Sequence, residues 1–130
     1  MDPSRGGNVS EVIGRMNDIL ANLWGVTPDA HVFLSTVTHI NATRCADYGV
    51  DSAGACPPDM AANIAEFNRL LPSQVVAPAV AKGKKIHLHD VNKDAQWTES
   101  DYFTHGIHFS LKGFAKMAAS WEGALMTLFN

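Results

Sequence analysis

The sequence lacks the features that mark several large classes of protein. It holds only two cysteines, Cys45 and Cys56, in 130 residues, which is too few for a disulfide scaffold and lacks the spacing of a zinc site. No run of 18 uncharged apolar residues occurs, so no segment is expected to span a bilayer. Basic residues do not cluster beyond Lys82–Lys85, and the formal net charge is −3, which argues against a nucleic-acid partner.

No signal peptide is expected at the beginning of the chain, because residues 1–7 are polar. Two glycosylation sequons, at Asn8 and Asn41, point the other way, toward a secreted parent protein. One local bridge between Cys45 and Cys56 would agree with that compartment. The localisation therefore stays open.

What is present is the composition of one globular domain, with 46% hydrophobic and 18% charged residues. Apolar spacing predicts a helix from Asn8 to Gly25, with Asn8 and Glu11 forming a capping box. The apolar run from His31 to Val37 predicts a strand buried on both faces. The following segment, Asn41 to Asp59, is expected to be a loop.

Helical spacing returns from Met60 to Gly83, although Pro72 and Pro78 must kink or divide this helix. A second strand is predicted from Lys84 to Val91, and an irregular segment from Asn92 to Phe109. Ser110 is then expected to cap a final helix. Its apolar stripe comprises Leu111, Phe114, Ala118, Trp121, Leu125 and Leu128, and we expect it to pack on a sheet.

This order of elements predicts an α/β fold with a short parallel sheet of about two strands and three main helices. In such a sheet, ligands bind at the carboxyl ends of the strands. Two strands offer little surface for three amphipathic helices to cover. Strands are therefore either missed by this interpretation or absent from this chain.

The segment from Tyr102 to His108 carries the most chemistry, because two histidines lie between the last strand and the last helix. A histidine in that loop can act as a general base when another group orients it. The alternative is a surface loop in which His105 and His108 are simply solvated.

The tail of the chain resembles the last motif block of the SGNH hydrolases, the GDSL-type esterases and lipases, which reads D-G-[IL]-H-P, then G-[YF], then K-M-A. The matching residues are Gly106, Ile107, His108, Gly113, Phe114, Lys116, Met117 and Ala118. Upstream, Phe67-Asn68, Pro72, Gly83-Lys84 and Asp90 resemble the corresponding run of the acetyl-xylan-esterase-like branch, and Thr27 to Val32 resembles its strand entry.

This resemblance implies a three-layer α/β/α fold of the flavodoxin-like SGNH type, of which residues 1–130 would form the C-terminal portion of a single domain. It implies an ester hydrolase that acts on acyl or acetylated carbohydrate substrates without a cofactor, through a Ser-Asp-His triad. His108 matches the catalytic histidine, which is the general base. His105 stands at the position of the family's aspartate, and an imidazole cannot replace a carboxylate as the partner of a protonated ring.

The blocks that carry the nucleophilic serine and the oxyanion hole should precede the first helix, yet only seven residues do. Ser35, Ser52 and Ser110 lack the glycine-flanked strand-to-helix turn of a nucleophile. The chain alone is therefore expected to be inactive as an esterase. The alternative is a non-catalytic binding or interaction protein derived from the same fold.

A small metal-binding domain is a third interpretation. His87 and His89 alternate along a predicted strand and so share one face, and His105, His108, Asp90 or Asp101 could complete a zinc site. Histidines at a strand end more commonly pack or form hydrogen bonds, and no metal site is predicted.

The resemblance also has a consequence for association. The strand that precedes His31–Val37 in the intact fold would lie beside it, and without that strand the edge is unpaired. An apolar edge strand is an association site, so self-association is expected.

Overall fold

The computed structural model describes residues 8–47, 59–103 and 106–127. The elements in chain order are α1 (Val9–Val26), β1 (Val32–Ser35), α2 (Ala42–Asp47), α3 (Met60–Leu71), the π-helical η2 (Pro72–Val76), α4 (Ala77–Ala81), β2 (Ile86–His89), α5 (Val91–Ala95), the 3-10 helix η3 (Glu99–Asp101) and α6 (Leu111–Met126). The predicted α/β class is confirmed. Among these residues, no helix is long and apolar enough to cross a membrane.

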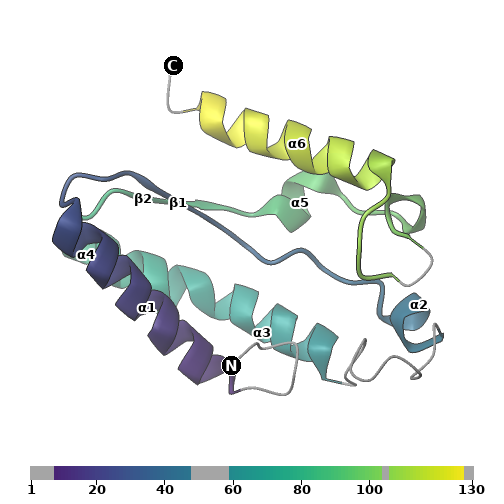
Figure 1. Ribbon diagram of the computed structural model, residues 1–130, viewed down its shortest axis with the longest axis horizontal. Helices are drawn as coiled ribbons and strands as arrows, with labels where there is room; N and C mark the ends of the chain where they lie inside the picture. Colours follow the sequence, from purple (N-terminus) through teal and green to yellow (C-terminus); the bar gives the residue numbers. More distant parts are fainter. Residues whose placement is uncertain (1–7, 48–58, 104–105, 128–130) are drawn as a thin grey trace.

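The two strands form a parallel pair, with Val32 opposite Ile86 and Ser35 opposite His89. They run between two groups of helices (Figure 1): α1, α3 and α4 on one side, α5 and α6 on the other. The predicted parallel neighbours are thus confirmed, each strand being shorter than predicted. Within the described part of the chain, each strand has no other strand partner, so one edge of each is unpaired.

The core lies between the strands and the helices of the first group. Its buried members are Ile13, Leu20, Trp24, Leu34, Phe67, Leu71, Val75, Ala79 and Ile86. In β1 only Leu34 is buried, so the expectation of burial on both faces is wrong. The helices of one side cover that strand well, whereas its other face is only partly covered.

Helix α1 buries a narrower stripe than its spacing predicts. Ile13 and Leu20 are buried, but Ile19 is 63% exposed and Leu23 is 42% exposed. Trp24, which the predicted stripe omitted, completes the buried line at positions i, i+7 and i+11. The stripe is narrow because α1 packs chiefly against α3 and η2, on one side only.

The beginning of α1 is confirmed in position but not in detail. The Asn8 side chain caps the helix by accepting a hydrogen bond from the Ser10 N–H at 3.0 Å. Glu11 instead accepts from Arg15, four residues later, at 2.7 Å, which is an exposed ion pair along the helix. The predicted capping box is therefore wrong. The helix ends at Val26, one residue past the predicted stop at Gly25.

The division of the second helical segment at its prolines is confirmed. Because Pro72 has no N–H, the helix changes to a π-helical turn there, and the Ala77 N–H bonds the Pro72 carbonyl five residues back. Pro78 lies in the first turn of α4, which directly continues η2. Gly83, with a φ of 71°, then turns the chain toward β2.

Two segments predicted to be irregular contain short helices. In the segment Asn41 to Asp59, α2 begins after Asn41, whose side chain accepts from the Arg44 N–H at 3.1 Å. In the segment Asn92 to Phe109, Asp90 caps α5 and η3 follows. These helices form at polar caps, so a search for apolar periodicity misses them. The rest of the first loop, residues 48–58, lies outside the described residues.

Helix α6 begins as predicted, because the Ser110 hydroxyl caps it by accepting from the Gly113 N–H. Its apolar stripe is not a core stripe, however. Leu111 and Phe114 are 87% and 53% exposed, and Leu125 is exposed as well. Trp121 does meet a strand residue, with its ring 4.9 Å from that of His89. The expectation that Phe114 and Leu125 pack on a sheet is wrong, because α6 lies over α5 and η3 rather than over the strands.

Cys45 is buried in α2 and is not a free thiol. Its predicted partner, Cys56, lies outside the described residues. The bridge between the two therefore stays a prediction, with thiol titration of the unreduced, denatured protein as its measurement.

Candidate functional site

A polar cleft of about 430 Å³ lies at the carboxyl ends of the two parallel strands. Its lining residues are Thr36, His39, Ala65, Asn68, Arg69, Asp90, Asn92 and Lys93. They come from the end of β1, from α3 and from the start of α5. This is the edge at which open α/β sheets bind ligands.

Two asparagine side chains of this cleft hold the backbone that follows β1. Asn68 accepts from the Val37 N–H at 2.8 Å and donates to the Val37 carbonyl at 2.7 Å, so it pairs with Val37 as a neighbouring strand would. Asn92 accepts from the His39 N–H at 2.8 Å and also donates to the Val37 carbonyl at 2.8 Å. The chain leaving β1 is thereby fixed from both sides.

The same cleft contains a second polar link between the strands. Asp90 accepts from the Thr36 hydroxyl at 3.1 Å and from the backbone N–H groups of Asn92 and Lys93 at the start of α5. Arg69 is held by a bidentate ion pair with Glu66, both bonds being 2.8 Å long. Several polar groups of the cleft thus bind one another, and Arg69 is held by a residue of its own helix.

The turn that carries His108 lies against the chain leaving β1. Tyr102 and Phe109 form an antiparallel bridge, and the Phe103 N–H donates to the His108 carbonyl at 2.9 Å. The Tyr102 hydroxyl donates to the His39 carbonyl at 3.0 Å, and the Asn41 N–H donates to the Gly106 carbonyl at 2.8 Å. These bonds join the turn to the segment between β1 and α2.

Gly106 is the tightest point of this turn. Its φ is 70°, and a Cβ built there would collide with the Asn41 carbonyl and the Arg44 Cβ. Only glycine combines that backbone conformation with so close an approach. The backbone geometry alone therefore requires a glycine at this position. The side chain of His108, two residues later, is exposed to solvent.

A buried carboxylate anchors the base of the turn. Asp101 is fully buried, and its Oδ2 accepts hydrogen bonds from the Thr98 N–H, the Thr98 hydroxyl and the Lys116 ammonium at 2.7, 2.8 and 2.6 Å. Burial raises the pKa of this carboxyl, but the bonds from Lys116 and Thr98 outweigh burial and lower its pKa to about 2. Burial and the charge of Asp101 together raise the pKa of the Tyr102 phenol.

The structure describes some of the predicted site residues and not others. His108 lies on the turn as expected, whereas His105 lies outside the described residues. The hydroxyls of the alternative nucleophiles serve local structure: Ser35 donates to the Thr36 carbonyl, and Ser110 donates to the Ser100 carbonyl while capping α6. Ser52 also lies outside the described residues.

The two strand histidines of the alternative zinc site, His87 and His89, have different side-chain partners and do not meet. His87 faces His31, with their Nε2 and Nδ1 atoms 3.3 Å apart. His89 lies instead with its Nε2 2.8 Å from the Ser120 hydroxyl and its Nδ1 3.4 Å from Asp94. Across the described residues, no group of three histidine, cysteine or acidic side chains could hold a metal ion.

Asn68 and Asn92 shape the cleft but were not among the predicted site residues. The sequence could have identified Asn68, because this residue falls on the buried face of α3, between Ile64 and Leu71, where an apolar residue is expected. The indication for Asn92 in the sequence is weaker: it is a polar residue just after a predicted strand. A polar side chain that is at least half-buried on an apolar stripe implies a hydrogen-bond partner elsewhere in the chain.

In comparisons with known proteins, no family model, no curated protein and no solved structure matches the chain.

Proposed function

We propose that this chain is the carboxyl-terminal part of an SGNH-type ester hydrolase, in which His108 is the general base. The observation that carries the proposal is the position of the His108 turn. It precedes α6 and is bonded to the chain leaving the carboxyl end of β1, next to the cleft. A general base of an α/β hydrolase belongs at that edge of the sheet.

The general base would take the proton of a serine hydroxyl as it attacks an acyl or acetyl ester. His108 is exposed, so a substrate could reach it. A protonated imidazole needs a carboxylate to orient and stabilise it, and in the resemblance that position is occupied by His105. Asp101, the nearest preceding acid in the described sequence, is bonded to Thr98 and Lys116. We therefore expect the nucleophile and the orienting group to come from outside this chain.

The first experiment measures hydrolysis of p-nitrophenyl acetate by the isolated chain. We expect no saturable turnover above the background of free imidazole, and the same rate for His108→Ala. His31→Ala is the matched control, since His31 is an exposed histidine at the opposite end of β1. Saturable turnover that disappears in His108→Ala and after treatment with a serine-directed inhibitor would overturn the expectation of inactivity.

The second experiment separates an incomplete hydrolase from a binding protein. The gene is read upstream of the Met1 codon, and the extended protein is assayed on acetylated xylan oligosaccharides. We expect an in-frame G-D-S block, and activity that falls at least about 1,000-fold in His108→Ala but not in His31→Ala. A gene without that block, or an extended protein indifferent to His108→Ala, contradicts the proposal and favours the non-catalytic alternative.

A further inference from the structure

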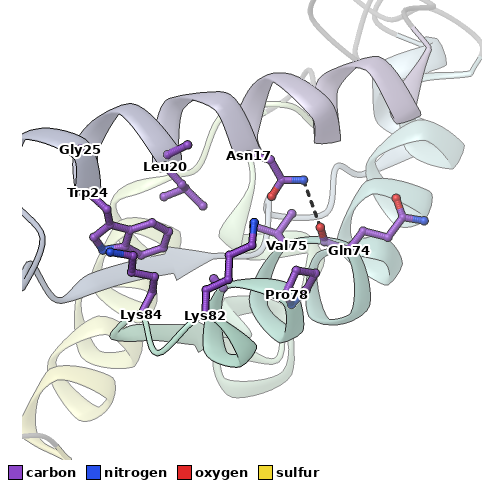
Figure 2. A pocket seen from close by; sticks show the side chains of 11 residues that line it. Asn17, Leu20, Trp24, Gly25, Gln74, Val75, Pro78, Lys82 and Lys84 are labelled. Atoms are coloured by element: carbon purple, nitrogen blue, oxygen red, sulfur yellow. Dashed lines mark hydrogen bonds between the residues drawn. The ribbon is translucent and has the colours of Figure 1, made fainter.

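A second hollow lies far from the cleft, between the C-terminal half of α1 and the η2–α4 segment (Figure 2). It encloses about 530 Å³. The lining residues are Asn17, Leu20, Ala21, Trp24, Gly25, Gln74, Val75, Pro78, Ala79, Lys82 and Lys84. We call this hollow the α1–α4 groove. Its volume falls in the range of small-molecule sites.

The floor of the groove is apolar and firmly held. Leu20, Trp24, Val75 and Ala79 belong to the buried core, so their positions are fixed by packing on β1 and β2. The Trp24 N–H donates to the Ala30 carbonyl at 3.1 Å, which fixes the plane of the indole. The floor is therefore preformed and has no free indole donor to satisfy.

The shape of the groove follows from the residues on its walls. Ala21 and Gly25 leave α1 without bulk on this side, and the π-helical turn η2 supplies the opposite wall. π-Helical turns inside α-helices occur often at functional sites. One end is closed by a hydrogen bond from the Asn17 side-chain amide to the Gln74 carbonyl, 3.1 Å long (Figure 2).

The charge of the groove is of one sign. Among the described residues, Lys82 and Lys84 are the only charged ones that line it, and no carboxylate does. In Figure 2 the Lys82 side chain extends from the end of α4 toward α1, and the Lys84 ammonium lies 5.9 Å from the centre of the Trp24 ring. The neighbouring Lys85 differs, because it lies 4.0 Å from Asp29 and does not line the groove. Two cations over an apolar floor stand out in a chain of net charge −3.

We propose that the α1–α4 groove binds a small amphiphilic organic anion, with its apolar body on the Trp24–Val75 floor and its acidic head between Lys82 and Lys84. The apolar body gains by leaving water, and the head gains two charge-assisted contacts at the rim. This binding does not depend on ester hydrolysis, because the groove lies away from the cleft at the carboxyl ends of the strands.

Calorimetric titration with three probes tests the proposal. Decanoate carries both features, acetate only the acid, and decyltrimethylammonium only the alkyl chain with the opposite charge. We expect saturable one-to-one binding of decanoate, with the two other probes at least about tenfold weaker. Equal binding of decanoate and decyltrimethylammonium would overturn the proposal, because the lysines would then play no part.

Variants locate the binding. Lys82→Gln and Lys84→Gln should each weaken decanoate binding several-fold, and together more than tenfold, whereas Lys85→Gln should leave it unchanged. Ala21→Phe should abolish binding by filling the groove from an exposed position on α1. If Ala21→Phe fails to fold, the lysine variants still test whether decanoate binds in the groove. Decanoate that binds the double lysine variant as tightly as it binds the native chain contradicts the proposal.

Discussion

Asp101 holds together the local structure around the His108 turn. Its carboxylate is fully buried and joins η3 to α6, because Lys116 of α6 and Thr98 before η3 both bond the same oxygen. The Asp101 backbone carbonyl also accepts from the Ser110 N–H at 2.8 Å. One residue thus fixes both ends of the turn that carries His108.

Replacing Lys116 by methionine leaves that buried carboxylate without its cation. We expect the free energy of unfolding at pH 7 to fall by about 3 kcal/mol, the usual cost of breaking one partner of a buried ion pair. Denaturant unfolding followed by circular dichroism measures it. Lys112→Met is the control, because Lys112 is more exposed and lies 3.9 Å from Asp101, and it should change stability by less than about 1 kcal/mol.

The same carboxylate predicts a pH dependence. Its pKa is lowered in the folded state, so its contribution to stability is complete above the pKa of the unfolded chain, near 4, and is lost as the pH falls toward 2. The stability of the native chain should fall across that window. Lys116→Met should show a smaller fall there, and parallel curves for the two proteins would contradict this role for Asp101.

The packing of α6 depends on how closely its first turn can approach η3. The helix is capped and regular, yet Gly113 is its only buried residue within the described range. A Cβ at Gly113 would collide with the Asp101 carbonyl and with the Phe109 ring, so glycine lets the first turn of α6 approach η3. The closest packing of this helix is therefore made by a residue without a side chain.

Two glycines of α6 give a matched pair of substitutions. Gly113→Ala should destabilise the protein by about 1–3 kcal/mol, because the helix must move away from Asp101. Gly123→Ala should stabilise it by about 0.5–1 kcal/mol, because that position is open and alanine favours the helix. Thermal unfolding of both variants measures the difference. A stabilising Gly113→Ala would show that α6 is not seated on η3.

The parallel strand pair leaves an unpaired edge, which affects the association of the whole molecule. The Val32 N–H donates to the Lys85 carbonyl, just before β2, at 2.8 Å, and the Thr36 N–H donates to the His89 carbonyl of β2 at 3.0 Å. By the alternation of a strand, the N–H groups of Phe33 and Ser35 point to the other edge of β1, which has no strand partner in the described part of the chain. Exposed apolar side chains of α6, such as Leu111 and Phe114, add apolar surface to the molecule.

We therefore expect the isolated chain to self-associate through the free edge of β1 at micromolar concentration, as light scattering would show. Ser35→Pro removes one donor from that edge without touching the bonds to β2, and should shift the chain toward the monomer. Ser35→Ala keeps the donor and should associate like the native chain. A cooperatively unfolding native monomer would show that the sheet is complete without a further strand.

The elements that could be predicted from the sequence are those whose signals are local. The caps at Asn8 and Ser110, the division at Pro72 and the two strand segments follow from residues within a few positions of one another. The parallel pairing followed too, because a helical crossover joins the two strands. The short helices α2 and α5 escaped prediction, since a polar cap and one turn carry no apolar period.

Which faces are buried and which polar groups meet could not be predicted from the sequence, because both depend on the tertiary structure. Asn68 pairs with Val37 across 31 residues, and His87 meets His31 across 56, so no local pattern reveals either contact. The exposure of Phe114 and the apolar floor beneath Lys82 and Lys84 likewise depend on where whole helices lie. Local structure follows from torsional preferences and nearby hydrogen bonds, whereas burial and long-range bonds follow from packing, which depends on all elements at once.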